Sequence, residues 1–211
     1  MGKLLKAEFY KLHKLYSFRM IFLFVLAVGM LRGFSPYSGY QVYNIGLVPE
    51  LFDAVLIAVF TVAFLCTEFS NRTFGNAFLC GTSRQNVFFA KLVVYFPGLL
   101  VLILFPLILS TLLATMRNGF GADWEALEMA AKFLFYIVHR ISMAGFSILV
   151  AVVIQNSLGT LGLSVAGIYL MSLSQNSVAN SLTQDTLIDS IIKTAIFLSV
   201  ATFIFRKRDW K

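Results

Sequence analysis

Four ionisable residues lie inside long apolar stretches, where a charge is costly. Glu50 and Asp53 are three positions apart near the start of the second stretch, so they share one face of a helix. His139 and Arg140 lie near the middle of the fourth. A buried arginine usually faces protein or water and finds a partner. Two interpretations follow: Arg140 pairs with Glu50 or Asp53 as a structural ion pair, or the four residues form a charge network along a water-filled substrate path.

Motifs for catalysis are missing from the chain. The stretch GNAFLCGTS at 75–83 has neither the glycine spacing nor the lysine of a phosphate-binding loop. No HExxH or GxSxG occurs, and the two histidines are isolated from each other. His139 has no nucleophile or second base that the sequence places beside it. We therefore predict that this chain is not an enzyme and binds neither nucleotide nor metal.

Composition places these residues in a membrane protein. Of the 211 residues, 59% are hydrophobic and only 13% are charged, with a mean hydropathy of +0.83. A soluble protein is nearer a quarter charged. We predict an all-α, polytopic membrane protein with a single transmembrane domain over 1–211 and no removable signal peptide. Six transmembrane helices are expected, at about 17–32, 47–66, 92–116, 127–154, 158–173 and 187–205, with an interfacial loop at 33–46.

The N-terminal segment, 1–16, has the pattern of an amphipathic helix. Leu5, Phe9, Leu12 and Tyr16 share one face, and lysines gather on the other. Such a helix lies in the headgroup layer, where its lysines meet anionic lipid. The alternative is that these lysines are simply the basic flank of the first span.

The distribution of charge predicts the topology. Twelve of the 17 basic residues fall in the segments that this map places inside, whereas the outside links carry acidic residues. With both termini cytoplasmic, the positive-inside rule is satisfied. We therefore expect a multi-pass protein of a bacterial cell membrane. The net charge of +7 then reflects topology and contact with membrane lipid, and it does not indicate binding to nucleic acid.

A polar segment at 67–91 separates the second and third spans. Its expected order is Glu68 at the membrane exit, a short helix with one apolar face, a helix stop at Gly81, and a new helix that Ser83 caps. The apolar face is built from Phe74, Phe78 and Leu79, and the basic or polar residues beside it are Arg72, Thr73, Arg84 and Lys91. This face either contacts a protein partner or inserts into the headgroup layer.

This pattern, an acidic residue, then R-T, a short helix, G-x-S-R and a lysine, resembles that of the membrane subunits of type-2 ATP-binding-cassette (ABC) exporters. The chain departs from it at Arg72, where a glycine is common, and at 81–82, where a proline often stands. The resemblance implies that 67–91 carries a cytoplasmic coupling helix that docks on a separate ATPase. It also implies two copies of that cytosolic ATPase, which bind ATP and Mg, and a second permease subunit that forms a homodimer or heterodimer, with the second and fifth spans nearest the interface.

The residues and the resemblance together predict the permease half of an ATP-driven exporter. The resemblance implies a cargo that is an amphipathic or antimicrobial peptide or a lipophilic drug. Two other classes stay open: a secondary transporter or channel that needs no ATPase, and a membrane scaffold or sensor. Small residues give two spans a face for close helix contact, either within the chain or with another subunit. They are Gly29, Gly33, Gly159, Gly162, Ala166 and Gly167.

Overall fold

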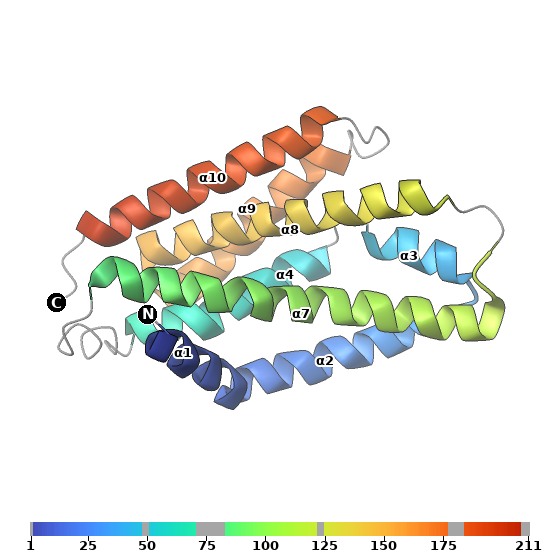
Figure 1. Cartoon of the computed structure of the whole chain (residues 1–211), viewed down its shortest axis with the longest axis horizontal. Coiled ribbons are helices and arrows are strands. Elements are labelled where there is room, and N and C mark those ends of the chain that lie inside the picture. Colours follow the sequence, from blue (N-terminus) through green and yellow to red (C-terminus); the bar gives the residue numbers. More distant parts are fainter. Residues whose placement is uncertain (1, 48–50, 71–82, 122–124, 177–183, 208–211) are drawn as a thin grey trace.

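We analysed a computed structural model of the chain, which describes residues 2–47, 51–70, 83–121, 125–176 and 184–207 (Figure 1). Within these ranges the regular structure is helical throughout, so the all-α expectation is confirmed. The helices are α1 (Gly2–Lys14), α2 (Tyr16–Gly33), α3 (Gly39–Leu47), α4 (Leu51–Thr61), the π-helix η1 (Val62–Cys66), α5 (Thr67–Ser70), α7 (Arg84–Asn118), α8 (Ala126–Ile154), α9 (Ser157–Asn176) and α10 (Gln184–Lys207).

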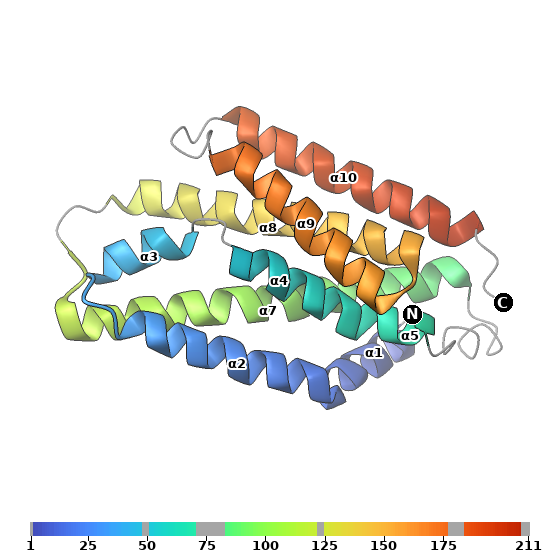
Figure 2. The same ribbon diagram turned by 180° about the vertical axis from the view of Figure 1, so that it is seen from behind.

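The helices form an elongated bundle along one axis (Figure 1). The long helix α7 packs against α2, α3 and α1, while α8 packs against α9, α10 and α4. Seen from behind, α4 and α9 lie on the same side of the bundle (Figure 2). The start of α1 and the end of α10 lie toward the end of the bundle where α7 begins, as both termini on one membrane side would require.

Five of the described helices are long and apolar enough to cross a membrane. They are Tyr16–Gly33, Leu51–Phe69, Gln85–Asn118, Ala126–Ile154 and Leu187–Lys207. They correspond to five of the six expected spans. The remaining one, expected at 158–173, lies in the shorter apolar helix Ser157–Ser172. Within the described ranges, therefore, five helices and not six have the length and composition of a membrane span, as expected of a multi-pass protein.

The expected interfacial loop at 33–46 is wrong over most of its length, because α3 occupies Gly39–Leu47. Its first two backbone N–H groups, at Gly39 and Tyr40, donate to the carbonyl groups of Gly119 and Phe120 at 3.0 and 2.9 Å. The hydroxyl of Tyr43 donates to the carbonyl of Met129 at 2.8 Å. The connection after α7 thus caps a helix whose glycine, tyrosine and asparagine residues would not favour it by propensity alone.

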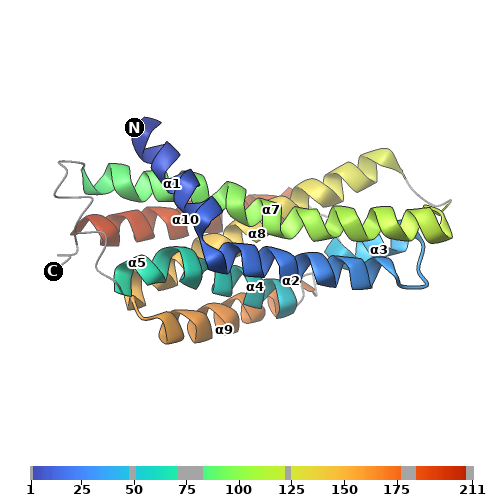
Figure 3. The same ribbon diagram turned by 90° about the horizontal axis from the view of Figure 1, so that it is seen from below.

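The helix α1 docks on α7 and rises from α2 at a wide angle (Figure 3). Its buried residues include Leu12 and Glu8, which are 7% and 5% exposed, whereas Phe9 is 46% exposed. A helix therefore forms in this segment, and its buried face is centred on Glu8 and Leu12 and not on Phe9.

Glycines in the first span allow α2 to approach α7 closely. A Cβ atom added at Gly29 would lie 3.0 Å from Cα of Pro106 and 3.1 Å from its carbonyl oxygen. One added at Gly33 would lie 2.7 Å from Cβ of Leu113. In contrast, a Cβ added at Gly162 in α9 would meet no atom within 4 Å. The small residues of α2 thus serve packing within the chain, while the face of α9 at Gly162 is open.

We expect Gly29→Ala to lower the free energy of unfolding by about 1–3 kcal/mol, because the new methyl group meets rigid backbone of α7. The matched control Gly162→Ala enters open space and should change stability by less than about 1 kcal/mol, with the helix propensity of alanine in its favour. Thermal unfolding of both variants in the same detergent measures the difference. Equal unfolding temperatures would show that α2 and α7 are not in close contact.

Candidate functional site

Four charged side chains form a cluster at the end of the bundle where α7 begins. This end cluster consists of Glu8 and Lys11 from α1, Glu68 from α5 and Lys91 from α7. Lys91 Nζ lies 2.8 Å from Glu8 Oε2 and 2.5 Å from Glu68 Oε2. Lys11 Nζ lies 3.1 Å from Glu8 Oε1 and 3.7 Å from Glu68 Oε1. Two lysines and two glutamates thus join three helices.

Burial makes this cluster strong. The side chain of Lys91 is 1% exposed and that of Glu8 is 6% exposed. Removing one partner of a buried pair leaves an uncompensated charge, which costs several kcal/mol.

Lys11 is the more exposed lysine of the end cluster. Burial alone would lower its pKa, but the carboxylates of Glu68 and Glu8 outweigh this and raise the pKa above its ordinary value. Its stabilising contribution is therefore complete at neutral pH and is lost only as the pH rises through that raised pKa.

Glu68 and Lys91, two residues of the predicted coupling segment, face each other inside the chain. Sequence reasoning missed the third member of this contact, Glu8. The signal was present, because Leu5, Glu8 and Leu12 have helical spacing on one face of a basic helix. An acidic residue on the apolar face of such a helix indicates a buried basic partner.

The remaining residues of the expected coupling segment divide into two groups. Ser83 caps α7 as expected, since its hydroxyl accepts a hydrogen bond from the backbone N–H of Asn86 at 3.4 Å. Arg84 is the first residue of α7, and α5 continues the second span as far as Ser70. The others lie outside the described residues; they are Arg72, Thr73, Phe74, Phe78, Leu79 and Gly81.

A second polar site is the ion pair of Arg140 with Asp53, which joins α8 to α4. The Arg140 side chain is 1% exposed, and its guanidinium carbon lies 4.6 Å from the centroid of the Tyr136 ring. This is one of the two pairings expected from the sequence. Glu50, the other expected partner, lies outside the described residues. A small cavity of about 20 Å³ adjoins the pair, with Arg32, Asp53 and Tyr136 in its wall. That volume holds one water molecule.

His139 does not join this ion pair. Its side chain is buried, and its ring stacks on that of Phe135 with the centroids 6.0 Å apart. Neither ring nitrogen has a hydrogen-bond partner among the described residues. The structure thus separates two adjacent residues: Arg140 forms an ion pair with Asp53, whereas His139 stacks on Phe135.

A third polar site is a chain of buried hydroxyl groups that crosses the bundle. The hydroxyls of Thr61 and Tyr95 lie 2.7 Å apart. Ser147 is 2.9 Å from Thr61 and 3.1 Å from Ser164. These residues come from α4, α7, α8 and α9. Serine and threonine are common in membrane helices, so the sequence alone did not single them out.

The hydroxyl chain lies where the second span changes its helical form. Thr61 is the N-cap of η1, and the five residues of this π-helix lead directly into α5. Single π-helical turns within α-helices occur frequently at functional sites. The second span thus contributes one residue to each polar site. Asp53 on α4 belongs to the ion pair, Thr61 at the start of η1 to the hydroxyl chain, and Glu68 on α5 to the end cluster.

These features define a class: a polytopic helical membrane protein with two ion-paired sites and a chain of hydroxyl groups inside the bundle. Within the described ranges, no three His, Cys, Asp or Glu residues are grouped so as to hold a metal. The model of the family described as "ABC-2 family transporter protein" matches residues 4–174, and the chain belongs to that family. The resemblance found in the sequence is therefore confirmed.

Family membership has two consequences. Membrane subunits of this family are permeases without an ATPase site of their own, and membership implies an ABC ATPase partner. Neither a curated protein nor a solved structure matches the chain. Its finer properties must therefore be inferred from its own residues.

We expect Asp53→Ala to destabilise the protein by roughly 3–5 kcal/mol, because it removes the carboxylate that forms an ion pair with the buried Arg140 side chain. The double variant Asp53→Ala, Arg140→Met removes both charges and should recover much of that loss. Thermal unfolding in detergent of the wild type, both single variants and the double variant completes the cycle.

The exposed pair of Asp189 and Lys193 in α10 provides the control. Asp189→Asn should change stability by about 0.5 kcal/mol or less. If Asp53→Ala were as mild as this control, the ion pair of Asp53 with Arg140 would not contribute to stability.

Proposed function

We propose that the chain is the permease subunit of an ATP-driven exporter, which works as a dimer with two copies of a cytosolic ATPase. The nucleotide and its Mg ion belong to that ATPase. The observation that carries the proposal, beside family membership, is the position of the end cluster. It joins the two helices, α5 and α7, that flank residues 71–82 in the chain.

The end cluster converts a local push into movement of several helices. A partner that displaces residues 71–82 applies force to the end of α5 and the start of α7. Glu68 and Lys91 hold these two helices together, and Glu8 adds α1 to them. Because separating such buried charges costs several kcal/mol, the three helices should move as one unit. This gives the segment 67–91 the role of a coupling segment, with Glu68 and Lys91 as its internal contacts.

The second span can carry this movement deeper into the bundle. It continues from α5 through η1 to α4 and meets the hydroxyl chain at Thr61 and the ion pair at Asp53. Polar networks with two discrete arrangements are a usual means of coupling distant sites. We infer that the hydroxyl chain and the ion pair of Asp53 with Arg140 allow the spans to tilt, so that the substrate path alternates between an open and a collapsed state.

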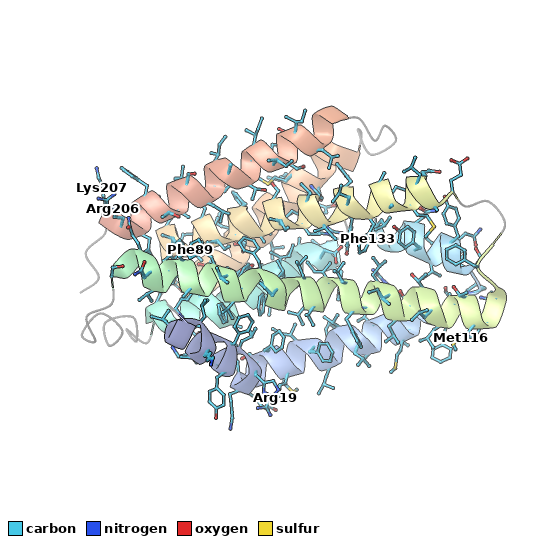
Figure 4. The ribbon with its side chains drawn as sticks, in the orientation of Figure 1. Arg19, Phe89, Met116, Phe133, Arg206 and Lys207 are labelled. Atoms are coloured by element: carbon cyan, nitrogen blue, oxygen red, sulfur yellow. The ribbon has the colours of Figure 1, made fainter. Side chains whose placement is uncertain are left out.

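One observation supports a dimer, and another supports termini on the cytoplasmic side. The face of α9 at Gly162 is open, which leaves room for a helix of a second permease subunit. The end of α10 carries Arg206 and Lys207, and these lie at the same end of the bundle as the end cluster, opposite Met116 (Figure 4). That concentration of basic residues favours the cytoplasmic side of a bacterial cell membrane. We propose that the cargo is an amphipathic peptide or a lipophilic drug, because a substrate path between apolar spans would have apolar walls.

Association with the ATPase is tested by affinity purification from mild detergent. We expect Phe78→Ala, Leu79→Ala to abolish recovery of an ATPase with the chain, because it removes the apolar contact proposed for the coupling helix. The matched variant Leu31→Ala, Phe34→Ala removes two exposed apolar side chains near the opposite end of α2 and should leave recovery unchanged. If the wild type recovers no ATPase from its native membrane, the exporter proposal fails.

The role of the end cluster is tested separately from binding. We expect Glu8→Gln to keep the ATPase bound but to lower ATP hydrolysis of the purified complex by about tenfold or more, since Lys91 then loses a buried charge partner. The control Glu128→Gln breaks an exposed pair with Lys132 at the start of α8 and should have little effect. Full hydrolysis in the Glu8 variant would exclude the end cluster from coupling.

A further inference from the structure

Three cavities form one continuous groove along α2 and α4. The first, of about 280 Å³, is bounded by Lys11, Lys14, Thr67 and Glu68. The second, of about 430 Å³, shares Ala63 and Thr67 with the first. The third, of about 580 Å³, shares Met20, Ile21 and Val59 with the second. The groove thus begins among charged groups at the α1 end and continues into an apolar region.

The far part of the groove has apolar walls. Apolar side chains line the third cavity throughout, among them Phe24, Phe52 and Leu56. Several of these walls are open to the surroundings: Met20 is 49% exposed, Phe24 61% and Val55 40%. An apolar groove beside a membrane span is suited to a hydrocarbon chain.

The near end of the groove carries surplus positive charge. Within the end cluster the two glutamates balance Lys11 and Lys91. Lys14 is exposed and stacks over the ring of Tyr10 at 5.4 Å, and no described carboxylate lies within ion-pair distance of it. Arg19, labelled at the bend between α1 and α2 in Figure 4, donates from Nε to the carbonyl of His13. An anion at this end would therefore meet unbalanced cations.

We propose that this groove binds an anionic phospholipid of the leaflet that faces α1. Its phosphate lies beside Lys14, which bounds the first cavity, and one acyl chain follows the groove toward Val55. From Thr67 to Val55 the second span rises about 18 Å at 1.5 Å per residue. Half of the hydrocarbon core of a bilayer is about 15 Å thick, which matches this length. The site is thus a resident lipid site, and it does not depend on the proposed export function.

The charged end distinguishes this occupant from a second copy of the chain. A subunit interface would bury the charge of Lys14 without a partner, unless the second copy supplied a carboxylate to it. A lipid phosphate pairs with Lys14 while it stays in the headgroup layer, where basic residues near a span commonly meet anionic lipid.

Native mass spectrometry of the full-length chain in detergent tests the site. The probes are dioleoyl-phosphatidylglycerol, which is anionic, and dioleoyl-phosphatidylcholine, which is neutral overall. The wild type should bind the anionic lipid several-fold more tightly. Lys14→Gln should weaken binding of the anionic lipid by about fivefold, the effect of one basic residue near an anionic surface, and leave the neutral lipid unchanged.

A second variant tests the acyl part of the groove. Val59→Trp places a large ring where the second and third cavities meet and should reduce binding of both lipids. Val101→Trp adds the same ring to α7 at a position that is 48% exposed and outside the groove, and it should bind as the wild type does.

Three results would overturn the site. Equal binding of the two lipids by the wild type would exclude headgroup recognition. Unchanged lipid binding in Val59→Trp would show that the lipids lie elsewhere on the surface. A loss of dimer in Val59→Trp without a change in lipid binding would assign the groove to a second copy.

Discussion

The attraction between Lys91 and two glutamates is the interaction on which the arrangement of this bundle depends. A lysine that is 1% exposed cannot stay charged inside a protein without partners, and Glu8 and Glu68 supply them from two other helices. The docking of α1 follows from this requirement, because its buried face is centred on Glu8. Leu12 adds an apolar contact on the same face, so α1 is held by the bundle and not only by the membrane surface, as an ordinary amphipathic helix would be.

The second span combines two needs that usually conflict. It has to be apolar enough to lie in lipid, yet it carries polar residues to three separate internal contacts. Asp53 meets Arg140, Thr61 meets a chain of hydroxyls, and Glu68 meets the lysines of the end cluster. Each contact joins the span to a different set of helices. A membrane protein has little hydrophobic drive between its helices, so specific contacts of this kind fix their relative positions.

Much of this structure could be predicted from local patterns. The apolar runs predicted the helices, the cost of a buried arginine predicted a partner for Arg140, and the sequence before α7 predicted the cap at Ser83. Contacts between distant segments could not be predicted in this way. The helix α3 exists because backbone groups after α7 cap its first turn, and Glu8 is buried because α7 brings Lys91 to it. Neither cause is visible within the segment concerned. The hydroxyl chain could not be predicted for another reason: serine and threonine are common in membrane helices, and only the packing of the four helices brings these hydroxyl groups into contact.

The π-helix η1 has a consequence for the direction in which Glu68 points. A π-helical turn holds more residues than an α-helical turn, so it changes the rotational phase of everything that follows. In an α-helix each residue advances by about 100°. If the extra residue of the π-helical turn were removed and the span were a continuous α-helix, Glu68 would therefore be rotated by about 100° relative to Asp53. The carboxylate would then point away from Lys91. The π-helical turn at Val62–Cys66 therefore sets the direction of the side chains that follow it, and it allows one span to contact partners on different sides of the bundle.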